Sequence, residues 1–432
     1  ASHPLLARAC HLGTALAQPM LTKLLRWMVS GDMSFFGAVI CIILGLTNAQ
    51  RGHVTTLAGS GDGEHADGTG VAAGFIRPGK VAVSPDGMAL YVGNHDFEHC
   101  IRKVAVATGV VTTLAGLNNT KGTADGVGTN ARFESPIGID VSGTIVYVAD
   151  SFNNRIRQVD VETGNVTKLA GSLAGSDAAA GFSDGTGTHA KFNKPEGVAV
   201  SPDGGTLYVS EWINNCIRVV DVATGSVTTL AGSAGDAGSI DGIGTAARFN
   251  GLQDVTVSPN GFFLYVSDYL NNRIRKVVVA TGEDYEYGNV TTLAGSGVAD
   301  SIDGTSTAAS FNRPGGVDTS PDGTVLYVAE GIGNKIRQVD VETGSVTTLA
   351  GSGSDNHTDG MGTSASFNAP DGVAVSPEGR VLYVGDTFNH RIRQVASSPL
   401  HCSPRVIVAG SACTRLFPYC SSPFGWLVWA DH

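Results

Sequence analysis

The amino-acid sequence predicts an all-β protein, a six-bladed β-propeller built from four-stranded antiparallel blades. Three observations lead to this prediction. One sequence unit recurs six times in the same phase, each unit contains four short strand-like segments joined by tight turns, and glycine is abundant, with 58 Gly among 432 residues and only 16% charged residues. Short strands in repeats longer than about 50 residues are typical of propellers. The glycine-rich, charge-poor composition favours strands and turns over helices.

The repeat is visible in four motifs. Segments of the type VTTLAG begin at Val54, Val111, Val166, Val227, Val290 and Val346, at spacings of 57, 55, 61, 63 and 56 residues. An F-x-x-P motif, or FNGL in the fourth unit, begins at Phe75, Phe133, Phe192, Phe249, Phe311 and Phe367. A segment of the type LYV and an I-R dipeptide complete every unit. This self-similarity predicts six equivalent blades.

Each unit is expected to contain four strands, a to d. In the third unit these are Gly197–Pro202, Thr206–Glu211, Cys216–Val222 and Ser226–Gly232. Tight turns with Asp-Gly or Thr-Gly join a to b and c to d, because these residues tolerate positive φ. The b–c loops and the d–a loops, the latter about 15–20 residues long, then share the opposite face, which we call the long-loop face. Long loops on a rigid scaffold usually carry binding residues, so we expect the ligand there.

The phase of the repeat also predicts how the ring closes. A strand d (Val54–Gly59) precedes the first strand a, and only a partial VTTLAG match follows the sixth strand c, Arg391–Val395. We therefore expect the N-terminal strand to complete the last blade, which removes an open edge that would otherwise pair with other chains. The predicted propeller covers residues 50–396.

The unit FNAPDGVAVSPEGRVLYVGDTFNHRIRQV, Phe367–Val395, resembles an NHL repeat, and the other five units match it. The resemblance covers about 345 of the 432 residues. It implies a six-bladed propeller, in agreement with the count of units. The NHL family includes protein-binding and RNA-binding modules, bacterial receptor sensor domains and a zinc-dependent lyase, so the resemblance implies the fold strongly and the function weakly.

The segments on either side of the propeller follow no repeat. Residues 1–49 form an N-terminal extension in which residues 33–49 resemble a signal peptide, with the apolar run Phe35–Leu46 and small residues before a cut after Ala49. That run is short for a transmembrane helix, and anchoring by residues 33–50 is the alternative. Residues 397–432 form an irregular tail with three cysteines. We therefore expect a secreted or extracellular protein whose mature domain does not insert into a membrane.

The net charge and the loop motifs argue against two classes of ligand, nucleic acids and calcium ions. The formal net charge is −11 and the sequence has no basic run, so nucleic-acid binding is not expected, because it needs clustered Lys and Arg. An Asp-Gly pair recurs in each d–a loop, but most loops offer one Asp, whereas calcium needs several converging oxygen ligands. We interpret these Asp residues as structural. No cofactor is expected, with Ca²⁺ or Zn²⁺ as the alternative, and the metal ligands are unassigned.

An acid ends strand b in five units and precedes an Arg by seven positions, as Asp150 and Arg157 do. If residues 150 and 156 face each other in a regular hairpin, Arg157 points to the opposite side of the sheet from Asp150. Because blades pack face to face, we expect each acid to pair with the Arg of a neighbouring blade. These residues are then scaffold, and no catalytic residue is assigned.

Departures from the repeat mark the candidate ligand-binding residues. Directly after the acid of strand b, the third and fourth units carry Trp212 and Tyr269, aromatic residues suited to a peptide or sugar ligand. The next position is always apolar, as at Phe152 and Ile213, and is interpreted as core. Near the axis, Lys80 and Asp254 stand where strand a normally has Gly, and Glu196 and Asp371 directly precede that position, so these four are the charged candidates. The alternative is an axis that merely tolerates charge.

The sequence favours a monomeric binding module over an enzyme. We expect an extracellular or cell-surface module that recognises a protein, peptide or glycan through the long-loop face. The alternative is a metal-dependent hydrolase or lyase with its site at the central channel, although no His lies on or beside a strand a. An intracellular scaffold is a further reading if residues 33–50 are retained.

Overall fold

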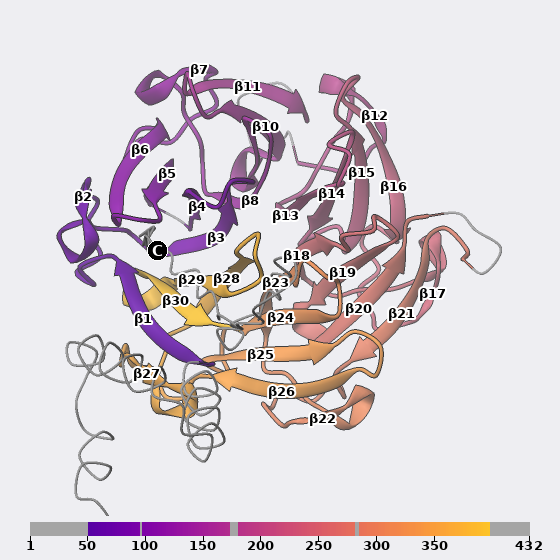
Figure 1. Ribbon diagram of the computed structural model, residues 1–432. Coiled ribbons are helices and arrows are strands. Elements are labelled where there is room, and N and C mark those ends of the chain that lie inside the picture. Colours follow the sequence, from indigo (N-terminus) through magenta and orange to yellow (C-terminus); the bar gives the residue numbers. More distant parts are fainter. Residues whose placement is uncertain (1–50, 96, 173–179, 281–284, 398–432) are drawn as a thin grey trace, which may run out of the picture. The chain divides into compact units, whose positions relative to one another are not determined.

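The computed structural model describes residues 51–95, 97–172, 180–280 and 285–397. The predicted signal peptide and the Cys-containing tail beyond Ser397 lie outside the described residues. The described chain forms six antiparallel sheets arranged around a common centre, as Figure 1 shows. We number these blades 1 to 6 in the order of their innermost strands. Within the described residues we find no helix with the length and hydropathy that a membrane span requires.

Each blade runs outward from the axis through equivalent strands. The innermost strands are β3 (Pro78–Val83), β8 (Pro136–Ser142), β13 (Pro195–Val200), β18 (Leu252–Val257), β23 (Pro314–Thr319) and β28 (Pro370–Val375). The second strands are β4 (Ala89–Asn94), β9 (Ile145–Asp150), β14 (Thr206–Glu211), β19 (Phe263–Asp268), β24 (Val325–Glu330) and β29 (Val381–Asp386). The third strands are β5 (Cys100–Ala105), β10 (Arg155–Asp160), β15 (Cys216–Asp221), β20 (Arg273–Val278), β25 (Lys335–Asp340) and β30 (Arg391–Ala396).

The fourth strands are β6 (Val110–Gly116), β11 (Asn165–Ala170), β16 (Ser226–Gly232), β21 (Asn289–Ala294), β26 (Ser345–Ala350) and β1 (His53–Ala58). The outermost strands are β2 (Gly68–Thr69), β7 (Gly126–Val127), β12 (Gly185–Thr186), β17 (Gly242–Ile243), β22 (Gly304–Thr305) and β27 (Gly360–Met361). The blades therefore have five strands, and the prediction of four was wrong. The fifth strand has only two residues inside a Gly-rich loop, which is too short to produce a period-two hydrophobic pattern.

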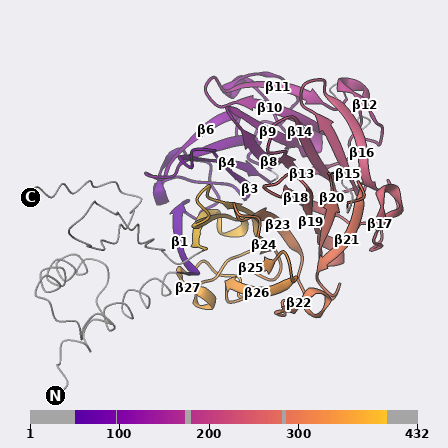
Figure 2. The same cartoon turned by 45° about the vertical axis from the view of Figure 1, so that its right-hand side comes forward.

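The strand β1 belongs to the sheet of blade 6, although it precedes every other strand in the chain. It pairs antiparallel with β30, with Val54 opposite Val395, and with the two-residue strand β27, with Val54 opposite Gly360. Figures 1 and 2 both show β1 in indigo beside the yellow and orange strands of this blade. The two ends of the described chain thus share one sheet.

The apolar core lies between adjacent blades. The tyrosine of each LYV segment packs on the next blade: Tyr91 of blade 1, for example, belongs to a buried cluster with Phe133, Ile139 and Val148 of blade 2. Equivalent clusters join the remaining neighbours, including blades 6 and 1, where Tyr383 packs with Phe75. The Phe that begins each F-x-x-P motif is therefore the apolar plug of a blade junction.

The acid and the Arg of each repeat pair within one blade, so the predicted pairing between blades was wrong. Residue 150 lies opposite Arg155, not residue 156, which places Arg157 on the same face of the sheet as Asp150. The Arg157 Nη1 donates to Asp150 at 2.9 Å, and Nη2 donates to Asp125 of the same sheet at 2.6 Å. A register difference of one residue moves a side chain to the other face, which explains the error.

The Asp of each d–a loop is structural, and it acts through bonds to neighbouring strands rather than as a cap of the short turn that follows. Asp184, for example, accepts hydrogen bonds from the backbone and hydroxyl of Thr229 and from the buried guanidinium of Arg218. Its carboxylate therefore ties the outermost loop to the third and fourth strands of the blade. Asp67, Asp125, Asp241, Asp303 and Asp359 also pair with the Arg of their own blade. All of them except Asp125 also accept a hydrogen bond from a Thr hydroxyl.

One set of polar contacts between neighbouring blades comes from a different residue, the one that ends each b–c loop in the left-handed conformation. Asn154 has φ 53° and accepts a hydrogen bond from the backbone N–H of Lys194 in the next blade at 2.8 Å. Asn215, Asn272 and Asn334 make the equivalent bond to Gly251, Arg313 and Ala369. His99 and His390 replace Asn in blades 1 and 6, and their Nδ1 atoms accept from Ser135 and Arg77. We call these six contacts the inter-blade latch.

Candidate binding site at the mouth of the central channel

Strand pairing brings the candidate residues to one end of the axis. The first residue of each innermost strand lies opposite the last residue of the second strand, as Pro78 lies opposite Asn94. The residues that start strand a and those that follow strand b therefore meet on the long-loop face. This places Lys80, Asp254, Glu196, Asp371, Trp212 and Tyr269 around the mouth of the channel.

Asp371 is the centre of a buried polar network at this mouth. Its carboxylate pairs with Lys80 Nζ at 3.4 Å and with His95 Nε2 at 3.0 Å, and it accepts a hydrogen bond from Gln253 Nε2. Lys80 Nζ also donates to the backbone carbonyl of Asp371 at 3.1 Å and lies 3.5 Å from Asp254 Oδ2. Blades 1, 4 and 6 are thereby joined across the axis.

Burial and charge act in opposite directions within this network. Burial alone would raise the pKa of Asp371, but Lys80 and His95 outweigh it and hold that pKa well below its usual range. Burial alone would lower the pKa of Lys80, but Asp254 and Asp371 raise it above its ordinary value. Lys80 and Asp371 therefore form an ion pair at neutral pH, and both side chains are almost inaccessible to solvent.

Glu196 behaves differently from the other acids of the mouth. It is buried, yet among the described residues no side chain or backbone group donates a hydrogen bond to its carboxylate. Burial is the main reason that its pKa is raised to about 7, and His95 and Lys80 oppose that shift. At neutral pH Glu196 is therefore an acid without a partner, poised between its neutral and charged forms.

The aromatic candidates adjoin these charged groups. The rings of Trp212 and Tyr269 pack against each other with centroids 5.4 Å apart and planes tilted by 56°, and both side chains are half-buried. The Arg313 guanidinium carbon lies 5.3 Å from the Tyr269 centroid, a cation–π distance. Burial raises the pKa of Tyr269, and the carboxylate of Asp371 acts in the same direction. The two candidate sets thus belong to one surface.

His95, Gln253 and Arg313 are site residues that the sequence reasoning missed. His95 directly follows β4, which is the repeat position of Trp212 and Tyr269, so the same rule of departure from the repeat could have found it. Gln253 occupies the position of Glu196 and Asp371 in its own strand. Their meeting across the axis depends on closure of the ring and leaves no local signal.

The apolar position after Trp212 and its equivalents is exposed in four of five units, so its interpretation as core was wrong there. Leu270 is half-buried, but Phe152, Ile213, Ile332 and Phe388 are between 42% and 58% exposed, and Phe97 in the corresponding loop of blade 1 is 59% exposed. They lie at the centre of the short b–c loops, such as Ser151–Asn153, where the chain turns outward. Cations pack on them, with Lys194 Nζ at 4.5 Å from the Phe152 centroid and the Arg77 guanidinium at 5.2 Å from that of Phe388. We call this set the apolar rim.

The channel continues below the mouth as a cavity of about 120 Å³ lined by all six innermost strands. Asp140, Asp318 and Asp254 are its acids, and burial raises the pKa of Asp140 to about 7 and that of Asp318 to about 6. Asp140 and Asp318 each accept a backbone N–H from the next blade at 2.7 Å, from Val200 and Val375. These two carboxylates are therefore already engaged in joining blades.

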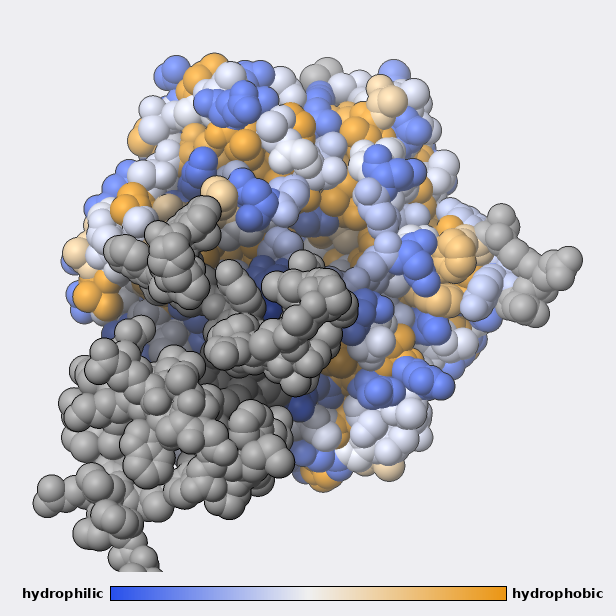
Figure 3. Space-filling model, viewed as in Figure 1, coloured by the Kyte–Doolittle hydropathy of each residue, from blue (hydrophilic) through white to orange (hydrophobic). Residues whose placement is uncertain are grey.

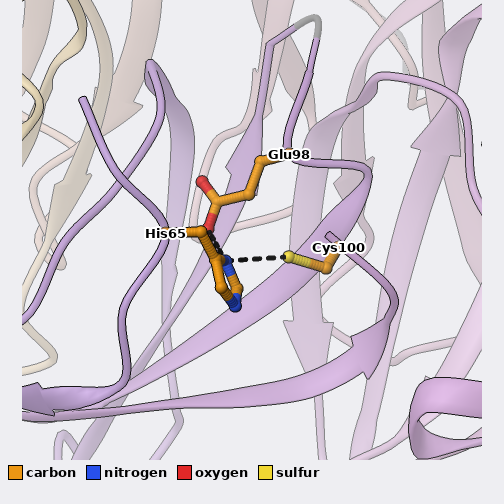
Figure 4. Close-up of side chains that lie close together, drawn as sticks. All are labelled: His65, Glu98 and Cys100. Carbon is orange, nitrogen blue, oxygen red and sulfur yellow. Dashed lines mark hydrogen bonds and ion pairs between the residues drawn. The ribbon is translucent and has the colours of Figure 1, made fainter. Parts of the chain in front are cut away.

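One group of potential metal ligands occurs in the described residues, and it lies away from the channel. His65 Nδ1 is 2.7 Å from Glu98 Oε1 and 3.9 Å from Cys100 Sγ, as Figure 4 shows. Arg102 Nη1 donates to the same Glu98 oxygen and lies 3.3 Å from His65 Nδ1. A guanidinium therefore already supplies the positive charge, and Glu98 replaces the strand-b acid that blade 1 lacks. The geometry fits an ion pair better than a metal site.

The visible face of the propeller mixes hydrophilic and hydrophobic residues, as the space-filling view shows (Figure 3). The mouth and the apolar rim together give the long-loop face both charged and apolar groups. Such a surface can orient a polar group of a ligand at its centre while apolar contacts form around it.

Comparisons with a family model and with curated proteins both indicate NHL repeats. The model of the NHL repeat matches residues 192–220. The chain is 27% identical over 366 residues to NHL repeat-containing protein 2 of Homo sapiens, covering 78% of this chain and 49% of that protein. It is 26% identical over 359 residues to the Bos taurus protein of the same name, covering 74% and 49%. The chain thus spans about half the length of the curated relatives it matches.

Among solved structures, an auxiliary nutrient binding protein from Bacteroides ovatus superposes with a TM-score of 0.60. The two sequences are 18% identical, and the match covers 80% of this chain and 77% of the other. At this identity the likeness shows the fold alone.

Proposed function

Because the chain is an NHL-repeat β-propeller, we propose that it is a binding module that recognises a protein, peptide or glycan on its long-loop face. The observation that carries this proposal is the apolar rim. Contiguous exposed apolar surface with a polar surround marks interaction sites, and these exposed side chains recur around one face of the ring. Trp212 and Tyr269, half-buried beside the rim, are of the residue types that dominate binding energy at interfaces.

We place this module outside the cell or at its surface. The support is the apolar run within residues 33–49, which has the length of a signal-peptide core. N-terminal sequencing of the mature chain from a secreting host tests this part: a mature terminus near Gln50 supports it, and retention of residues 33–49 in a cytosolic protein contradicts it.

The metal-dependent enzyme is the weaker alternative. The potential ligands His65, Glu98 and Cys100 surround a guanidinium rather than the channel. Inside the channel, the carboxylates of Asp371, Asp140 and Asp318 already accept hydrogen bonds from the protein. No observation on the described residues favours this alternative.

The binding face can be tested with rim variants. The purified full chain is applied to a glycan array and to a random peptide library, and the retained ligands are measured by solution titration. Ile332→Ser combined with Ile213→Ser should weaken binding at least about tenfold, because each removes an exposed apolar contact worth roughly 1 kcal/mol or more. The matched control is Met88→Ser with Phe262→Ser, which removes exposed apolar groups from the opposite face. Equal loss in both pairs would contradict the proposed face.

A further inference from the structure

Two acceptors at the channel mouth lack donors. Gln253 is only 8% exposed, and its Oε1 has no hydrogen-bond partner while its Nε2 donates to Asp371. The opposite orientation of the amide would direct Oε1 at the Asp371 carboxylate, so the donor pattern supports this assignment. Glu196, on the neighbouring innermost strand, has no donor among the described residues. A fully buried acceptor without a donor costs about 1–3 kcal/mol, so Gln253 Oε1 favours a ligand that donates. The Glu196 oxygens are not fully enclosed, so a donor can reach them.

The charge of the mouth also favours a cation. Three carboxylates, of Glu196, Asp254 and Asp371, face the ammonium of Lys80 and the imidazole of His95. Lys80 and His95 are engaged with Asp371, and Lys80 also lies near Asp254, so the negative charge of Glu196 is the one without a counter-ion. Lys194 and Arg313 are the other cations near the mouth, and each packs on an aromatic ring, Phe152 and Tyr269 respectively.

Two aromatic side chains, Trp212 and Tyr269, lie beside these acceptors. Trp212 and Tyr269 come from the same two blades as Glu196 and Gln253, directly after the second strands. Tyr269 already holds one cation, Arg313, at a cation–π distance. Aromatic faces next to a carboxylate suit the recognition of an ammonium group.

We propose that the channel mouth binds a primary ammonium group of a peptide ligand, with the Glu196 carboxylate as its counter-ion and Gln253 Oε1 as a second acceptor. Trp212 and Tyr269 cover the bound group. The ammonium belongs to the N-terminus or to a lysine side chain of the peptide, and the experiment separates these two sources. The inference rests on the proposed function, since it specifies the ligand of the same face.

The donor set favours ammonium over the other cations. A divalent metal ion needs several free oxygens, but those of Asp371 are committed to Lys80, His95 and Gln253. A guanidinium has five donors in a planar fork, more than two acceptors satisfy. An ammonium has three donors on a compact centre. Two of them bind the Glu196 carboxylate and Gln253 Oε1, and the third N–H faces the aromatic rings.

Three peptide libraries test the proposal on the immobilised full chain. The first lacks lysine and has a free N-terminus, the second contains lysine and is N-terminally acetylated, and the third lacks lysine and is acetylated. We expect the first or the second to be retained at least about tenfold more than the third, because a charge-assisted hydrogen bond to a buried acceptor contributes about 1.5–3 kcal/mol. Which of the two is retained identifies the source of the ammonium.

Glu196→Gln should reduce that retention about tenfold, while Glu378→Gln, an exposed Glu on the opposite face, should leave it unchanged. Retention of a lysine peptide should also increase from about pH 5.5 to about pH 7.5 as Glu196 ionises beside His95, Asp371, Lys80 and Lys194, and the Glu196→Gln protein should lose this dependence.

Equal retention of all three libraries, or an unchanged Glu196→Gln protein, would overturn the inference while peptide binding by this face stands. Binding to the glycan array without retention of any library overturns the inference and leaves the proposed function in place. If neither arrays nor libraries are bound, the proposed function fails and the inference fails with it.

Discussion

Replacing Arg275 by methionine removes a guanidinium that is fully buried in blade 4. Arg275 donates to Asp268 at 2.8 Å, to Asp241 at 2.6 Å and to the backbone carbonyl of Arg248 at 3.0 Å. Its guanidinium carbon also lies 5.1 Å from the Phe249 ring centroid. Methionine keeps part of the apolar stem but supplies no donor, so the fully buried Asp268 carboxylate loses its counter-ion.

The expected loss of unfolding free energy depends on how well each of the two acids tolerates the absence of Arg275. The Asp241 side chain is 49% exposed and is rehydrated readily, so its pair contributes little. Asp268 keeps the donors Asn250 N and Asn271 Nδ2 but stays buried and unpaired. Breaking a buried pair in this way costs about 3–5 kcal/mol. We expect a decrease of that size in the free energy of unfolding.

Urea unfolding of the full chain, followed by far-UV circular dichroism, measures this change. The companion variant Arg275→Met with Asp268→Asn removes the stranded charge and preserves the acceptor for Asn250 N, so it should recover at least about 2 kcal/mol. A loss below about 1 kcal/mol in the single variant, or no recovery in the double variant, would refute the assignment of Arg275 as the counter-ion of a buried acid.

Two further predictions concern the inter-blade latch. Asn334→Gly retains the left-handed backbone but leaves the Ala369 N–H without its acceptor, so unfolding should become easier by about 1–3 kcal/mol, while Asn119→Gly, an exposed left-handed position, should change stability by less than about 0.5 kcal/mol. In blade 6, burial and Arg77 lower the pKa of His390, whose neutral Nδ1 accepts the latch bond. The folded state therefore binds fewer protons than the unfolded state below about pH 6.5, and stability should fall as the pH decreases through that range. His390→Asn, which restores the residue of the other blades, should flatten this part of the urea-measured pH profile; an unchanged slope would contradict the role of His390.

The repeat made most of the fold predictable. The expected strands Thr206–Glu211 and Ser226–Gly232 coincide with β14 and β16, because alternating apolar residues bounded by turn glycines define both ends. The face on which Arg157 lies was not predictable in the same way, because it depends on a register difference of a single residue. The outward direction of Phe152 also escaped prediction, since an apolar residue type does not reveal whether a short loop turns toward the core or away from it.

The candidate site was predictable only in part. Departures from the repeat identified Trp212 and Tyr269, and the structure places them beside the charged residues near Asp371. The network around Asp371 joins residues separated by up to 291 positions, such as Lys80. Contacts of this range are set by the curvature of the whole ring, which no single unit encodes.

The shared sheet of β1 and β30 has a consequence for synthesis on the ribosome. The strand β1 is translated before the other strands described, but its longer partner, β30, begins at Arg391, which is 391 − 58 = 333 positions after Ala58, and the two-residue partner β27 begins only at Gly360. At about 5–20 residues per second, β1 waits roughly 15 to 70 s for β30. The equilibrium cost of so long a loop is small, since each doubling of length adds only about 0.6 kcal/mol. The delay therefore matters for the nascent chain rather than for the finished protein: until the last blade emerges, β1 is an unpaired, β-prone segment of the kind that favours aggregation.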